Sequence, residues 1–97
     1  MSEARLDAVG DDRWSLAGDL DFASVPAVWS DLEKALRGSA RVTLSLSGTQ
    51  RANSAGLALL IEALDVARRN GCELRLVDVP ADLMDLARMS QCEHLLA

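Results

Sequence analysis

Apolar and polar positions alternate strictly over residues 41–46 of the chain. Successive side chains of a strand point to opposite faces, so this alternation predicts a strand whose buried face carries Val42, Leu44 and Leu46. Ser47 and Gly48 are expected to end this strand. Residues 73–77 are predicted to form a further strand.

Two short segments near the N-terminus, residues 5–9 and 13–17, are predicted to form a β-hairpin. They flank Gly10-Asp11-Asp12, a Gly/Asp cluster of the type that closes a tight turn between two strands. The paired strands of a hairpin are antiparallel, so a larger sheet that includes them would be mixed.

A first helix is predicted between Ser24 and Gly38. Ser24 can cap its first turn, Pro26 needs no N–H in that turn, and Gly38 is expected just past its end. The apolar residues recur at helical spacing and make one stripe, which consists of Val25, Val28, Trp29, Leu32 and Leu36.

A second helix is predicted over residues 54–70, with Arg68 and Arg69 near its negative end and Gly71 as its terminator. A third helix is expected after Pro80. Its apolar positions are Leu83, Leu86, Ala87 and Met89. Residues 94–97 are expected to form a short strand or a frayed end.

This order of elements predicts one α/β domain over residues 1–97, a mixed sheet of about four or five strands covered by three or more helices. Consecutive parallel strands in such a sheet are joined by right-handed crossovers. The length of 97 residues is that of a single small domain and excludes a two-domain enzyme.

Composition narrows the class of partner. The net charge of −5 repels phosphates, and two Trp, one Phe and no Tyr provide no stacking platform for bases, so neither nucleic acid nor an anionic membrane surface is an expected partner. No secretion signal and no bilayer-spanning segment is evident, which predicts a cytoplasmic location. Cys72 and Cys92 lack the C-x-x-C spacing of a zinc site and are expected to be reduced thiols.

The second helix is more apolar than a helix that covers one face of a sheet requires. Its predicted sheet-facing arc consists of Leu57, Leu60, Ile61, Leu64 and Ala67. Leu59, Ala63 and Val66 widen that arc, either because they pack against a neighbouring helix or because they form a docking surface for a second protein. Small residues at the helix start would let another backbone come close.

Ser54 lies where a polar loop becomes this apolar helix, and four roles are open to it. Ser54 or Asn53 can be the N-cap. Ser54 can be a hydrolase nucleophile, with Asp78 or Asp85 and then His94 following in the order of that fold, although the first Gly of the nucleophile elbow is missing. It can accept a phosphoryl group at the positive helix end, or it can be an uncharged interface contact.

Two segments resemble motifs of the STAS domains, the family named for sulfate transporters and anti-sigma factor antagonists. Gly18-Asp19-Leu20-Asp21 is similar to the family's G-E-L-D segment, and Arg51 to Leu57 is similar to its helix-opening D-S-[ST]-G-[LVI] segment. In sigma-regulating members the serine matching Ser54 is phosphorylated by an anti-sigma kinase. Here Asn53 replaces the usual Asp and Ala55 replaces the second hydroxyl.

A closer resemblance is to the STAS domains that serve phospholipid ABC transporters of the Mla type, in the second helix and in residues 26–29. It implies a noncatalytic cytosolic subunit that needs no cofactor or metal and contacts an MlaF-like ATPase subunit, in a complex with a membrane permease at the inner membrane. Such a system maintains the lipid asymmetry of the outer membrane. The expected partner-binding residues are Asn53, Ser54, Ala55, Ala58, Leu59 and Glu62. An anti-sigma factor antagonist phosphorylated on Ser54 remains the alternative.

Overall fold

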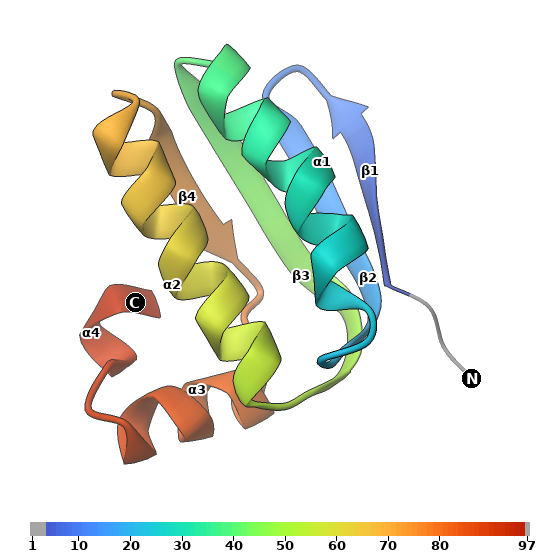
Figure 1. Cartoon of the computed structure of the whole chain (residues 1–97), viewed down its shortest axis with the longest axis vertical. Helices are drawn as coiled ribbons and strands as arrows, with labels where there is room; N and C mark the ends of the chain where they lie inside the picture. The colour runs from blue at the N-terminus through green and yellow to red at the C-terminus, as the bar shows by residue number, and fades with distance from the viewer. Residues whose placement is uncertain (1–3, 97) are drawn as a thin grey trace.

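The structure, a computed structural model, describes residues 4–96 and contains one mixed sheet with helices packed on it (Figure 1). The elements in chain order are β1 (Arg5–Gly10), β2 (Arg13–Leu20), α1 (Val25–Gly38), β3 (Arg41–Ala52), α2 (Ser54–Arg69), β4 (Glu73–Val77), α3 (Ala81–Met89) and α4 (Glu93–Leu96). The four strands lie in the order β1-β2-β3-β4. β1 pairs with β2 in antiparallel orientation, whereas β2, β3 and β4 are parallel. The predicted mixed α/β architecture is therefore confirmed.

The hairpin between β1 and β2 closes at the predicted Gly/Asp cluster. Asp12 has a φ of 59°, a left-handed conformation that Asp and Asn tolerate better than most residues. The carbonyl oxygen of Asp12 also accepts a hydrogen bond of 2.7 Å from the backbone N–H of Thr43. The turn is thus tied to the start of β3 as well as to its own hairpin.

Strand β3 is longer than its alternation predicts. It continues through Ser47 and Gly48 to Ala52, so the prediction that these two residues end it was wrong. The register between β2 and β3 shifts before Gly48 and again before Ala52, which lets both strands continue past irregular positions. Gly48 is required at the first shift because a Cβ there would lie 2.9 Å from the Cβ of Ala17.

Helices α1 and α2 lie side by side on one face of the sheet (Figure 1). α3 lies next to the start of α2, and α4 contacts both α3 and α2. Leu59 and Val66 of α2 are both buried, as is Ala63 between them. The widened apolar arc is therefore used within the domain. Two residues of the predicted sheet-facing arc, Ile61 and Leu64, are only half-buried, because the buried side of α2 is turned toward α1.

The helix ends differ in detail from the predictions. Asn53, and not Ser54, is the N-cap of α2, since its Oδ1 accepts a hydrogen bond of 2.8 Å from the N–H of Ala55. Ser24 occupies the N-cap position of α1 without a capping hydrogen bond, and Gly38 is the last helical residue. Gly71 follows α2 with a φ of +68°, as its predicted role as terminator requires.

The C-terminal segment forms a short helix instead of the expected strand or frayed end. Residues Glu93–Leu96 make α4, and the side chain of Leu96 is buried against the core. This contact with apolar neighbours orders a segment whose sequence carries no strong periodic signal. Residue 97 lies outside the described residues.

Candidate functional site

The loop from β2 to α1 and the junction from β3 to α2 lie side by side at the carboxyl ends of these two strands. Leu20 and Ala52 are register partners, and the N–H of Asn53 donates a hydrogen bond of 3.1 Å to the carbonyl oxygen of Leu20. The carboxyl ends of parallel strands meet at one edge, where binding sites of α/β proteins gather. The two segments that carry the STAS-like motifs are therefore neighbours in space.

Ser54 is the first residue of α2, and its side chain is exposed. Within residues 4–96 its hydroxyl has no hydrogen-bond partner, because Asn53 already performs the capping. A hydroxyl at this position faces solvent at the positive end of the helix dipole, while the N–H groups of Ala55, Gly56 and Leu57 are already bonded to Asn53. The geometry suits both of the remaining surface roles, a contact with a partner and a phosphoacceptor.

Gly56 brings the start of α2 against the strand ends. A Cβ at Gly56 would lie 3.0 Å from the Cβ of Leu20 and 3.3 Å from the Cβ of Ala52. Both distances are tighter than ordinary side-chain contacts, so only glycine fits without a shift. The small residue at this position therefore has an internal packing role and is not itself open to a partner.

An apolar groove of about 320 Å³ runs between the starts of α1 and α2, and we call it the α1–α2 groove. Its lining residues are Phe22, Val25, Pro26, Trp29, Ala55, Ala58, Leu59 and Glu62. Seven of the eight are apolar side chains contributed by both helices and the loop before α1. A groove of this kind is suited to an apolar anchor of another protein.

Four lining residues of this groove were not predicted to bind a partner: Val25, Pro26 and Trp29 were expected only as parts of the first helix, and Phe22 was given no role. Phe22 is the only Phe of the chain, and 73% of it is exposed although its side chain is large and apolar. The loop around it is held in place, because Asp21 Oδ1 accepts hydrogen bonds of 2.9 Å from the N–H groups of Ala23 and Ser24. The signal available in the sequence was a single aromatic residue beside a turn-forming Asp.

Of the six residues expected to bind a partner, Ala55, Ala58, Leu59 and Glu62 line this groove, and Asn53 and Ser54 directly precede Ala55 at the start of α2. Asn53, Ser54, Ala58 and Glu62 are exposed. Ala55 and Leu59 line the groove but are 6% and 3% exposed, since most of each side chain packs inside the domain. A partner would therefore contact only the outer edges of these two residues.

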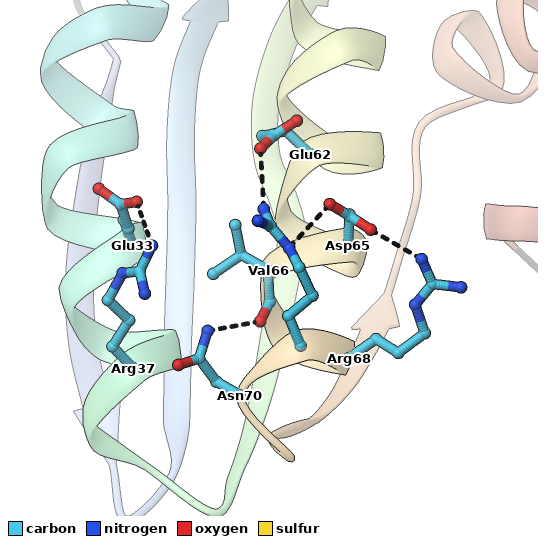
Figure 2. A network of polar contacts seen from close by, with 8 residues as sticks. Glu33, Arg37, Glu62, Asp65, Val66, Arg68 and Asn70 are labelled. Atoms are coloured by element: carbon cyan, nitrogen blue, oxygen red, sulfur yellow. Dashed lines mark hydrogen bonds and ion pairs between the residues drawn. The ribbon is translucent and has the colours of Figure 1, made fainter.

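The opposite end of α2 carries a network of ion pairs (Figure 2). Asp65 contacts Arg68 at 2.8 Å and Arg69 at 3.1 Å, and Arg69 reaches Glu62 at 3.5 Å. The side-chain amide of Asn70 donates a hydrogen bond of 2.8 Å to the carbonyl oxygen of Val66. The polar strip of α2 is thus largely paired with itself.

The residues of the hydrolase hypothesis are not assembled. His94 lines a hollow with α2 residues from Ile61 to Arg68, and Ile61 lies about 10 Å along the helix axis from Ser54 at 1.5 Å per residue. Asp78 is near the hydroxyl of Ser45, and Asp85 pairs with Arg88 at 2.9 Å. None of these three candidate partners is therefore placed to act as the base that nucleophilic catalysis by Ser54 requires.

The cysteines are both free thiols, with Cys72 buried and Cys92 half-buried. Burial raises the pKa of the Cys72 thiol, and the nearby carboxylates of Asp12 and Glu73 raise it further. In the part of the chain that the structure describes, no cluster of three or more His, Cys, Asp or Glu side chains could hold a metal ion. None of the helices between residues 4 and 96 combines the length and apolar character needed to span a bilayer.

Comparison with protein families and known proteins gives one consistent result. The family model described as Mlab, STAS domain matches residues 5–97. The intermembrane phospholipid transport system binding protein MlaB of Escherichia coli K12 is 30% identical over 89 residues, which cover 92% of this chain and 90% of that protein. MlaB of Shigella flexneri matches with the same identity and coverage.

Comparison with solved structures shows the same fold. The anti-sigma factor antagonist SpoIIAA in its unphosphorylated form superposes with a TM-score of 0.72 at 12% sequence identity. The match covers 95% of this chain and 84% of SpoIIAA. At this identity the likeness concerns the arrangement of strands and helices.

Proposed function

The chain belongs to the STAS domain family, and from this premise we propose that it is a noncatalytic subunit of a phospholipid transport system that binds the system's ATPase. Its 30% identity to MlaB over nearly the whole length of both chains supports the transport role. In this proposal the subunit lies at the cytoplasmic side of the inner membrane, attached through a complex that includes a membrane permease. The system maintains the lipid asymmetry of the outer membrane.

The proposed contact surface is the α1–α2 groove together with the start of α2. The observation that carries the proposal is the exposed, unbonded hydroxyl of Ser54 next to an apolar groove with an exposed Phe22 at its rim. Interfaces concentrate their binding energy in a few apolar or aromatic anchors surrounded by small and polar contacts. Burial of an exposed Phe side chain is worth about 1.5–3 kcal/mol, enough to matter for complex stability.

The test is co-purification with the transporter's MlaF-like ATPase, combined with its ATPase rate, for the wild type and Ser54→Arg. An Arg at Ser54 projects a long charged side chain beside the groove and is expected to reduce complex formation at least roughly tenfold, about 1.4 kcal/mol of binding free energy. Ser90→Arg is the matched control, since Ser90 is an exposed residue at the end of α3, away from the groove. Equal complex formation by both variants and the wild type would refute the proposed surface.

The second candidate function is an anti-sigma factor antagonist that is switched by phosphorylation of Ser54. The exposed hydroxyl at the start of α2 favours it, because the negative charge of a phosphoryl group there is stabilised by the positive end of the helix dipole. Intact mass after incubation with an anti-sigma kinase and ATP separates the two functions. The transport subunit predicts an unchanged mass, whereas the antagonist predicts one added phosphoryl group that Ser54→Ala abolishes.

A further inference from the structure

Strand β4 is an edge of the sheet, and its outer side has unpaired backbone groups. The N–H of Glu73 donates a hydrogen bond of 2.9 Å to the carbonyl oxygen of Ala40, so Glu73 and Arg75 direct their backbone groups toward β3. Successive residues of a strand alternate in this respect. The N–H and C=O groups of Leu74 and Leu76 therefore point outward, where residues 4–96 supply no partner for them.

A second groove of about 420 Å³, which we call the β4-edge groove, runs along this outer side. Its apolar lining residues are Leu74, Leu76 and Val77 of β4, Leu64 of α2, and Leu95 and Leu96 of α4, and the charged residues Glu73 and Arg75 line it as well. Figure 1 shows α2 in front of β4, on the face of the sheet that the helices cover, and α4 to the left of α2; both helices contribute residues to the groove. The groove thus combines backbone hydrogen-bonding groups with an apolar wall.

The other edge of the sheet is protected against an added strand. β1 has a register irregularity between Ala8 and Gly10, and its first residues carry the ion pair of Arg5 with Asp7 at 2.9 Å. Bulges are a usual means by which proteins prevent edge pairing, whereas charged side chains, which β4 also carries at Glu73 and Arg75, do not distinguish the two edges. β4 pairs with β3 in an unbroken register from Glu73 to Val77 and lacks such a bulge.

The charged side chains of β4 specify the ligand further. Glu73 and Arg75 also line the β4-edge groove, and because they are exposed and alternate with Leu74 and Leu76, their side chains project from the other face of the sheet. Neither residue takes part in an ion pair within the described part of the chain. Side chains directly opposite each other on neighbouring strands favour opposite charges.

We propose that the β4 edge binds an extended peptide segment of a partner protein, which adds a fifth strand to the sheet. The segment places apolar side chains beside Leu74 and Leu76, an acidic side chain beside Arg75 and a basic one beside Glu73. Its backbone bonds to the outward N–H and C=O groups of the two leucines. This is recognition by strand addition, in which the backbone provides affinity and alternate side chains provide specificity.

A second copy of the chain does not fit this edge, because each two-fold register leaves a conflict. Centring the pair on Arg75 places two Arg75 side chains opposite each other, which is repulsive. Centring it on Leu74 requires the N–H of Cys72, which already donates to the carbonyl oxygen of Ala67 at 2.8 Å. Centring it on Leu76 requires an extended Asp78, whose φ is 56°.

The test uses the whole chain and a terminally blocked hexapeptide in which Val alternates with Lys and Glu. Isothermal titration calorimetry is expected to show 1:1 binding, with slowed amide hydrogen exchange at Leu74 and Leu76. Arg75→Glu is expected to weaken this binding roughly fivefold and to favour a peptide in which Lys replaces Glu. N-methylation of the edge-facing peptide nitrogens is expected to abolish binding.

Two matched measurements make the result decisive. Ser54→Arg should bind the peptide as the wild type does, because the β4-edge groove and the α1–α2 groove share no lining residue. The proposal is overturned if hydrogen exchange at Leu74 and Leu76 is unchanged by saturating peptide, or if a composition-matched scrambled peptide binds equally well. Concentration-dependent dimerisation of the chain that Arg75→Glu abolishes would also overturn it in favour of a second copy.

Discussion

The two ends of α2 differ in how much apolar surface they leave exposed and in how far their polar side chains are paired. At its start Ser54 is exposed and unbonded beside the apolar α1–α2 groove, and a single side chain, Asn53, provides the capping hydrogen bond. At its end, Asp65 and Arg69 belong to a chain of ion pairs, and Gly71 terminates the helix. The first end offers a partner apolar area and a hydroxyl, whereas the second end has satisfied its own charges.

This difference indicates which end of α2 can contribute more free energy to the binding of a partner. Polar groups that are already paired gain little from a partner, because any new contact replaces an existing one. Apolar side chains that remain in water gain free energy whenever a partner covers them. Covering the start of α2 by a partner is therefore expected to lower the free energy more than covering its end.

The largest effect is expected from crowding the start of α2. Gly56→Val should destabilise the domain by about 2–3 kcal/mol, because even the first carbon of the new side chain lies 3.0 Å from the Cβ of Leu20. Gly38→Val is the control, since a Cβ at Gly38 meets nothing within 4 Å. Urea unfolding should separate the two variants clearly. Equal stability would show that the close approach of α2 to β2 is not required.

A smaller effect is expected from removing the cap. Asn53→Ala should cost about 1 kcal/mol of unfolding free energy, because the N–H of Ala55 loses its acceptor. Asn53→Asp keeps an acceptor oxygen and should stay close to the wild type. Thermal unfolding of the three proteins measures the difference. A stable Asn53→Ala variant would mean that solvent caps the helix as well as the side chain does.

The ion pairs at the other end are expected to contribute less than the cap. Asp65→Ala should cost roughly 0.5 kcal/mol, because its partners Arg68 and Arg69 are largely exposed and surface pairs are weak. The difference from the wild type should shrink in 1 M NaCl, where charges are screened. Binding of the ATPase should be unchanged. A loss of binding would place this end of α2 in the interface and contradict the comparison between the two ends.

The smallest effect at neutral pH is expected from Cys72, just past the end of α2. The pKa of its thiol is raised in the folded state by burial and by Asp12 and Glu73, so folding favours the protonated form. Its contribution to stability is therefore complete below the pKa of the unfolded thiol, about 8.5, and declines as the pH rises above that value. Urea unfolding at pH 7 and pH 10 should show a drop that Cys72→Ala reduces. An identical drop in the variant would assign it to other groups.

Much of the fold follows from local patterns. Strand β4 has the predicted ends, and α2 differs from its prediction by a single residue, because Gly71 and the apolar periodicity act over neighbouring residues. The exposed positions of the candidate site were also predictable, since Ser54 lies within the recognisable helix-opening motif and Ala58 directly follows it. The extension of β3 to Ala52 was not, because it depends on pairing with β2 through two register shifts.

The sequence by itself determined the order of elements from β1 to α3, the mixed sheet and the family, since periodicity, turn residues and short motifs are properties of neighbouring positions. Only the tertiary structure decided that Leu59 is buried while Phe22 is exposed, although both are large and apolar. It also decided that Asn53 caps α2 and leaves the hydroxyl of Ser54 unbonded. The physical reason is that burial and hydrogen bonding depend on which distant segments meet, and a local pattern does not carry that information.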